Sequence, residues 1–193
     1  MNENEFAIQR NEYDAAGMII RRQYYSESDA PVLIKDGYFS CDYEYDQNGN
    51  CLSRKYHGLD LEPIMTIWGC AEQRYYYDDL SRKVKEDFRN THSELCKSSI
   101  GVAVIKYQFD HAGNIISTNY YDEAEKPCLY KNYASVTKKY NDQNQLIQEE
   151  FFGINGEKVN CSKGYHSAVF QYDLNGNLIG IQYFDPDNHK LDL

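Results

Sequence analysis

The apolar positions of this chain fall into four columns that recur about every 32 residues. The first column is aromatic and precedes an Asp or Asn: Tyr13, Tyr45, Tyr77, Phe109, Tyr140 and Tyr172. The second is aromatic and follows eleven residues later: Tyr24, Tyr56, Phe88, Tyr120, Phe151 and Tyr183. An aliphatic column lies between them: Ile20, Leu52, Val84, Ile116, Ile147 and Ile179. The fourth holds Val32, Ile64, Cys96, Cys128, Val159 and Leu191. This period predicts stacked supersecondary units that bury their apolar sides against their neighbours.

Each copy contains two segments with the composition of a β-strand, such as 102–109 and 115–121. Between them lies the motif Asp-x-x-Gly-Asn, which predicts a hairpin turn because the Asp carboxylate can accept backbone N–H groups and Gly tolerates positive φ. The aliphatic and second aromatic columns are four residues apart and so share one face of a strand. We therefore expect antiparallel pairs, little helix, and an aliphatic column from Ile20 to Ile179 that is buried in every copy.

The predicted fold is all-β, an antiparallel β-hairpin repeat array. Twelve principal strands in one flat sheet would be unusual, so the sheet is expected to coil or curl; the alternative architecture is a parallel β-solenoid. Residues 1–193 form a single array with repeats at about 5–36, 37–68, 69–100, 101–131, 132–163 and 164–193. A one-residue deletion falls near Lys131-Asn132, where a loop tolerates it. Pro31, Pro63 and Pro127 mark an edge or the start of a short third strand.

Composition narrows the classes of partner. The formal charge of -10 disfavours nucleic acid and anionic membrane surfaces, and no apolar run is long enough to insert into a membrane. Nineteen tyrosines suit half-buried sheets and contact surfaces. Six cysteines without C-x-x-C spacing fit a reducing compartment, which favours the cytoplasm. A fragment of a longer exported protein would instead lie at the cell surface or be secreted.

Candidate chemistry is sparse, and we expect no catalytic residue, cofactor or metal. The oxygen-rich turns at 46–50 and 173–177 lack the alternating ligands and closing Glu of a calcium loop, and Asp185 to Asn188 is interpreted in the same way. The five histidines fall in five different repeat columns. Cys96 and Cys128 occupy an apolar column and are interpreted as small core residues.

The third repeat departs from the pattern and is the candidate partner-binding site. It replaces Gly-Asn with Ser-Arg and is preceded by the only tryptophan, whose column otherwise holds Asp36, Ile100, Lys131 and Lys163. Tryptophan and arginine are enriched at binding hot spots. The candidate residues are Trp68, Arg74, Arg82 and Arg89. Neutral drift of one repeat is the alternative, and substitutions in the Lys131 column are expected to be near neutral.

The run Tyr-Asp-Leu-Asn-Gly-Asn-Leu at 172–178, and the similar run at 45–50, resemble the YD or RHS repeats of bacterial surface and toxin-associated proteins. The resemblance implies antiparallel hairpins that build a shell, a spacer or an interaction surface. The period here is 32 residues, against about 20 in that family, and the family's toxin-processing core is absent. What carries over is the repetitive β scaffold.

These observations favour a non-enzymatic binding or structural module that presents a tyrosine-rich β surface to a protein or glycan. An enzyme of an unrecognised class is one alternative, although a catalytic site would break the repetition. A passive structural spacer is the other alternative.

Overall fold

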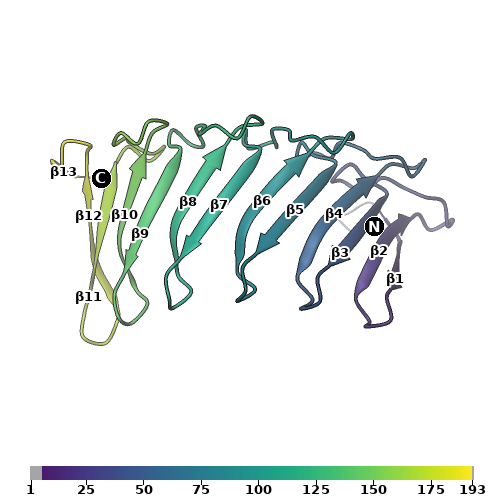
Figure 1. The fold of residues 1–193 in the computed structure, drawn as a ribbon, viewed down its shortest axis with the longest axis horizontal. Helices are drawn as coiled ribbons and strands as arrows, with labels where there is room; N and C mark the ends of the chain where they lie inside the picture. Colours follow the sequence, from purple (N-terminus) through teal and green to yellow (C-terminus); the bar gives the residue numbers. More distant parts are fainter. Residues whose placement is uncertain (1–5, 193) are drawn as a thin grey trace. The chain divides into compact units, whose positions relative to one another are not determined.

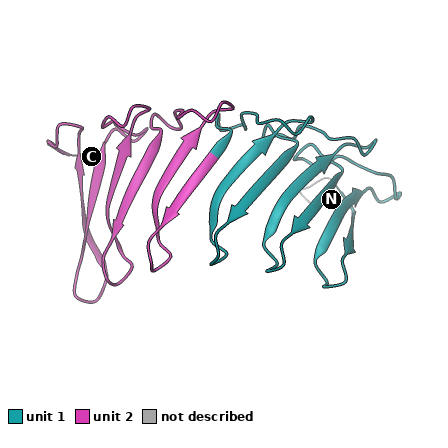
Figure 2. Cartoon of the chain, viewed as in Figure 1, with its two compact units in different colours: residues 1–104 teal, residues 105–193 magenta. Residues whose placement is uncertain are grey.

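The computed structural model describes residues 6–192, which contain strands and turns and no helix. Residues 6–192 contain thirteen strands, labelled in chain order in Figure 1. The chain divides into two compact units, residues 1–104 (unit 1) and 105–193 (unit 2), coloured separately in Figure 2. Within each unit, consecutive strands are neighbours in the sheet. Within the described range, no helix has the length and hydropathy needed to cross a membrane.

The strand bounds repeat regularly in both units. Unit 1 contains β1 (Ile8–Tyr13), β2 (Ile19–Tyr25), β3 (Ser40–Tyr45), β4 (Cys51–His57), β5 (Glu72–Tyr77) and β6 (Lys83–Arg89). Unit 2 contains β7 (Val104–Phe109), whose first residue belongs to unit 1, β8 (Ile115–Tyr121), β9 (Ser135–Tyr140), β10 (Leu146–Phe152), β11 (Ser167–Tyr172), β12 (Leu178–Phe184) and β13 (Lys190–Leu191). Each of the twelve longer strands corresponds to one of the two strand segments predicted per repeat.

The described strand pairings are all antiparallel. The predicted antiparallel hairpin array is therefore confirmed, and the parallel β-solenoid is wrong. The expected third strand is reduced to isolated bridges, such as those at Pro31, Pro63 and Pro127, and becomes a short strand only as β13. A proline at the bridge position lacks the N–H that a longer ladder would need.

The Asp-x-x-Gly-Asn motif forms the hairpin turn as predicted. In the copy that begins at Asp46, one carboxylate oxygen accepts the backbone N–H groups of Asn48 and Asn50 at 2.9 and 2.8 Å. The Asn50 side-chain amide donates to the other carboxylate oxygen at 2.8 Å, and Gly49 has φ 82°. The same amide also donates to the Ser81 hydroxyl at 3.0 Å. The final Asn of the motif thus fixes its own turn and links it to the turn of the next repeat.

The segment between hairpins uses the same turn chemistry, which the sequence analysis treated only as a polar stretch. Asp122 accepts the N–H groups of Ala124 and Lys126, each at 2.9 Å. The predicted deletion site forms a two-residue loop, with φ 49° at Lys131 and 73° at Asn132. Two consecutive positive φ values are typical of a type I′ turn, in which Asn is favoured.

The second aromatic column forms the core of one sheet face. Its first five members are at most 8% exposed, and rings from the linking segments pack between them. In unit 1 the rings of Tyr24 and Tyr56 lie 5.9 and 4.9 Å from that of Tyr38. In unit 2 the ring of Phe151 lies 4.7 Å from Tyr133 and 5.7 Å from Tyr165. We call each such row an aromatic ladder, and the face that carries it the ladder face.

The prediction that the aliphatic column is buried in every copy is wrong. Ile20, Leu52 and Ile179 are 39, 37 and 65% exposed, and the other three members are half-buried. In five hairpins this residue is skipped in the strand register, as the extra residue of a β-bulge beside the turn. It lies four residues, or about 13 Å, from the ladder ring on the same strand. The linking segments cover the ladder but do not extend to this end of the sheet.

The first aromatic column links repeats through its hydroxyls. Tyr45 donates to the Ile19 carbonyl at 3.0 Å, and Tyr172 donates to the Leu146 carbonyl at 2.9 Å. Tyr77 and Tyr140 make the equivalent bond to the preceding repeat. This role explains why tyrosine recurs at a position that is only partly buried.

Candidate functional site

Trp68 lies in the aromatic ladder of unit 1. Its ring centroid is 5.3 Å from that of Tyr56 and 6.0 Å from that of Tyr38. The side chain is half-buried. Trp68 therefore contributes to packing on the ladder face, with the remainder of its surface available for contact.

Arg74 and Arg89 lie on the opposite face. The strand register places Arg74 opposite Asp87 and Arg89 opposite Glu72. Arg74 Nε is 2.7 Å from Glu72 Oε1, and Arg89 Nε is 2.9 Å from Asp87 Oδ1. Glu72 is 3% exposed and Asp87 is fully buried. These arginines compensate buried carboxylates, because an unpaired buried charge would be costly.

Arg82 belongs to the turn of the third repeat. Its Nε donates to Asp78 Oδ2 at 2.7 Å, which is the bond that Asn50, Asn114 and Asn177 make in their turns. Ser81 adopts φ 58° in place of Gly. The four residues that the sequence analysis grouped are therefore divided among the ladder face, the opposite face and a turn. The structure does not bring them together in one surface.

The β9 repeat of unit 2 departs from its neighbours at a ladder-face position two residues before the first aromatic column. In unit 1 this position holds Tyr43 and Tyr75, and the Arg54 guanidinium carbon lies 6.0 and 5.7 Å from their ring centroids. Alternating rings and guanidinium groups thus fill that part of the face. In unit 2 the same position on β9 is Lys138, and Thr118 occupies the Arg54 column on β8. The narrower side chains leave a hollow of about 310 Å³.

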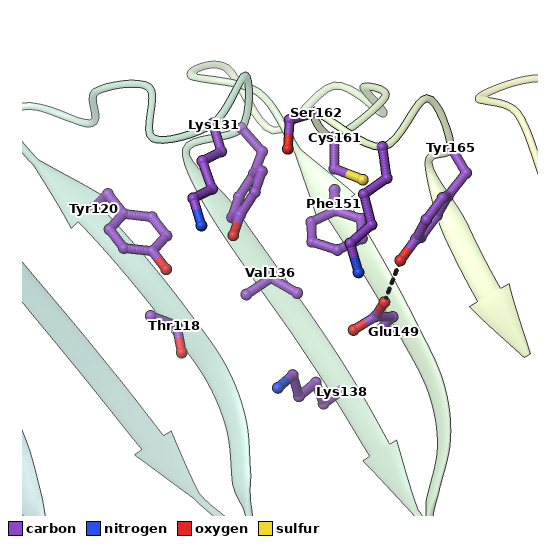
Figure 3. Close-up of a pocket in the computed structure, with 12 residues that line it drawn as sticks. Thr118, Tyr120, Lys131, Val136, Lys138, Glu149, Phe151, Cys161, Ser162 and Tyr165 are labelled. Carbon is purple, nitrogen blue, oxygen red and sulfur yellow. Dashed lines mark hydrogen bonds between the residues drawn. The ribbon is translucent and has the colours of Figure 1, made fainter. Parts of the chain in front are cut away.

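Three lysines border this hollow, which we call the lysine hollow (Figure 3). Lys131 and Lys163 come from two successive linking segments, at the repeat position that holds Trp68 in unit 1. Lys138 approaches from β9, beside Glu149 on β10. Figure 3 shows Lys131 extending from its linking segment toward Val136, and Lys138 lying on β9 beyond Val136, on the side away from that segment.

The acidic group of the hollow is already engaged. Tyr165 donates its hydroxyl to Glu149 Oε1 at 2.8 Å. Burial, together with this hydrogen bond and the carboxylate charge, raises the pKa of Tyr165. The phenol therefore remains protonated at neutral pH, and Glu149 remains an acceptor for it. The lining offers three cations against one occupied carboxylate, an arrangement suited to binding an anion.

Two other groups of side chains have the composition of a site but are explained by the fold. Ligand atoms of Asp185, Asp187 and His189 lie within 4.8 Å of one another, but Asp185 already accepts the backbone N–H groups of the other two at 2.9 and 2.8 Å. The turn accounts for this cluster. All six cysteines are free thiols, and burial raises the pKa of Cys70 to about 11 and that of Cys41 to about 12, which keeps both protonated at neutral pH.

Comparison with known proteins supports the fold. No family model matches the chain, and no curated protein matches it. Solved structures do. One is that of the "Photorhabdus luminescens Tc holotoxin pore, Mutation TccC3-D651A", with a TM-score of 0.59 at 20% identity. Another is that of "TcdB2-TccC3-TEV", with a TM-score of 0.60 at 18% identity. Each match covers 95% of this chain and 8% of the other chain. The fold is RHS-like in its antiparallel β architecture.

The lysine hollow was not predicted from the sequence. Its signal was the interruption of an aromatic column by Lys138, since Tyr43, Tyr75, Tyr107 and Phe170 occupy that position in other repeats. The Lys131 column was expected to be near neutral for binding, whereas the structure places two of its members at the hollow's rim. A single changed residue in a regular strand column, Lys138, was a better indicator of the hollow than the altered turn and loop of the third repeat were of a site.

Proposed function

We propose that this chain is a non-enzymatic module of a bacterial YD- or RHS-like protein, and that it presents the ladder face of unit 2 to a protein partner. The observation that carries this proposal is the lysine hollow, the place where a face filled by rings in unit 1 becomes open and cationic. A purely structural sheet would gain packing by filling that space. The likeness of fold to chains of multi-protein toxin complexes supports a protein partner.

The chemistry of the hollow favours binding over reaction. Among the described residues that line it there is no histidine, and its thiol, Cys161, is only 6% exposed. Its carboxylate is held by Tyr165. Nucleophilic catalysis needs a nucleophile hydrogen-bonded to a base, and among the described lining residues no hydrogen bond joins Ser162 or Thr118 to a lysine or to Glu149.

Neighbouring lysines on β9 allow a direct test. Lys138 lies on the ladder face, and Lys139 lies on the opposite face, where its Nζ contacts Gln148 Oε1 at 3.0 Å. A photo-reactive benzophenone amino acid is placed at each position in turn, and the protein is irradiated in the cells that normally make it. We expect one reproducible cross-linked polypeptide from position 138 and none from 139. Equal products from both positions, or none from either, would favour the passive spacer.

A further inference from the structure

We propose that the lysine hollow binds a carboxylate side chain of an acidic peptide segment, with Lys131, Lys138 and Lys163 as its cationic contacts. This inference rests on the proposed function and specifies the chemistry of the partner. It concerns unit 2 alone, because all the residues that line the hollow belong to that unit.

The lining of the hollow has a local charge opposite in sign to that of the whole chain. The whole chain carries 20 basic and 30 acidic side chains, yet the lining of the hollow has three lysines and one glutamate. Neither Lys138 nor Lys163 forms an ion pair with any residue between 6 and 192. Clustered, unpaired ammonium groups repel one another. An incoming carboxylate relieves that repulsion and is attracted to the site from a distance.

The base of the hollow is apolar, which strengthens contacts between opposite charges above it. Val136 and Phe151, at the base of the hollow, are 6 and 7% exposed. A carboxylate above them loses part of its hydration, and each contact with an ammonium group is stronger there than on an open surface. The Tyr133 hydroxyl lines the same space and can donate a hydrogen bond to the anion.

The packing of the ladder rings favours a peptide over a glycan. A sugar that stacks on tyrosine needs an uncovered ring face, but the ladder rings cover one another. The centroid of Tyr165 lies 4.7 Å from that of Tyr183 and 5.7 Å from that of Phe151, and the centroid of Tyr120 lies 4.7 Å from that of Tyr130. The volume is at the lower end for a ligand site, so it suits one side chain of a peptide that passes over the face.

The test uses the whole chain and defined probes. A labelled peptide of alternating glutamate and alanine is titrated with wild type at low salt, and binding is followed by fluorescence anisotropy. The same peptide with glutamine in place of glutamate reports any contribution that is independent of charge. An oligomer of galacturonic acid, which carries carboxylates on a sugar backbone, distinguishes a glycan from a peptide.

Two charge reversals of equal size locate the binding. Lys138→Glu should weaken binding of the glutamate peptide by about tenfold, whereas Lys139→Glu, one residue away on the opposite face, should change it by less than about twofold. A third variant, Lys138→Tyr, restores the ring that other repeats have at this position. It should fold like wild type and fill the hollow, with a loss of binding similar to that of Lys138→Glu.

Four results would overturn the inference. They are equal binding of the glutamine peptide, equal losses for Lys138→Glu and Lys139→Glu, undiminished binding to Lys138→Tyr, and tighter binding of the uronic acid oligomer than of the peptide. None of these outcomes decides the proposed function, because cross-linking from position 138 detects a protein contact of any charge. If cross-linking succeeds while the peptide fails to bind, only the assignment of an acidic partner is overturned.

Discussion

Truncation of Phe151 to alanine should destabilise unit 2 far more than truncation of Ile179. Phe151 is 7% exposed and contacts two ladder rings. Its loss removes a buried aromatic side chain and leaves a cavity, for a cost of about 3–5 kcal/mol. Ile179 belongs to the aliphatic column and is 65% exposed. Its truncation removes three carbons, each contributing about 0.8 kcal/mol when fully buried. Because only about a third of the side chain is buried, the expected cost is roughly 0.8 kcal/mol.

The assay must report on unit 2, because repeat arrays can unfold locally. The only tryptophan, Trp68, lies in unit 1, so tryptophan fluorescence does not report on the unfolding of unit 2. Urea titrations followed by far-ultraviolet circular dichroism should therefore be combined with amide hydrogen exchange of peptides from β9, β10 and β11. We expect faster exchange in these strands for Phe151→Ala and little change for Ile179→Ala. Similar costs for the two variants would refute the assignment of the core to the aromatic ladder.

Three further predictions concern turns, repeat contacts and pH. Tyr172→Phe removes the hydroxyl bond to the Leu146 carbonyl and should cost about 1 kcal/mol in urea unfolding. Gly113→Ala has free space around its new methyl group but must hold φ 90°, so it should cost about 1 kcal/mol by the same assay; an unchanged midpoint would contradict the turn geometry. The Asp42 carboxylate, with Oδ2 3.3 Å from His57 Nε2, raises the pKa of His57 above its usual value near 6.5. This contribution to stability is complete below that value and is lost as pH rises through the folded pKa, so thermal melts of His57→Gln should lack a decline that wild type shows as the pH rises above about 6.5.

Much of the fold could be predicted from the sequence because its determinants are local. The Asp-x-x-Gly-Asn motif satisfies its own hydrogen bonds, and the period fixed both the number of hairpins and their antiparallel pairing. The burial of Ile20 and its equivalents could not be predicted, since the bulge and the reach of the linking segments depend on which part of the sheet is covered. Periodicity identifies the face that a residue occupies but not the depth at which it lies.

The candidate site was predicted less well, for a related reason. Trp68 and the arginines are neighbours in sequence, yet strand alternation sends Arg74 and Arg89 to the face opposite Trp68. The lysine hollow, in contrast, gathers Lys131, Lys138 and Lys163 from two linking segments and a strand. Only the packing of adjacent repeats brings those three side chains together, and one repeat read alone does not show it.

The most direct test of the account is a lysine footprint of the protein alone and in the complex isolated from its own cells. Acetylation rates are measured at each lysine by mass spectrometry. The account predicts that Lys138 and Lys163 become protected in the complex while Lys139, on the opposite face, reacts at an unchanged rate. Protection of Lys139 with continued reactivity of Lys138 and Lys163 would contradict the claim that the ladder face of unit 2 is the contact surface.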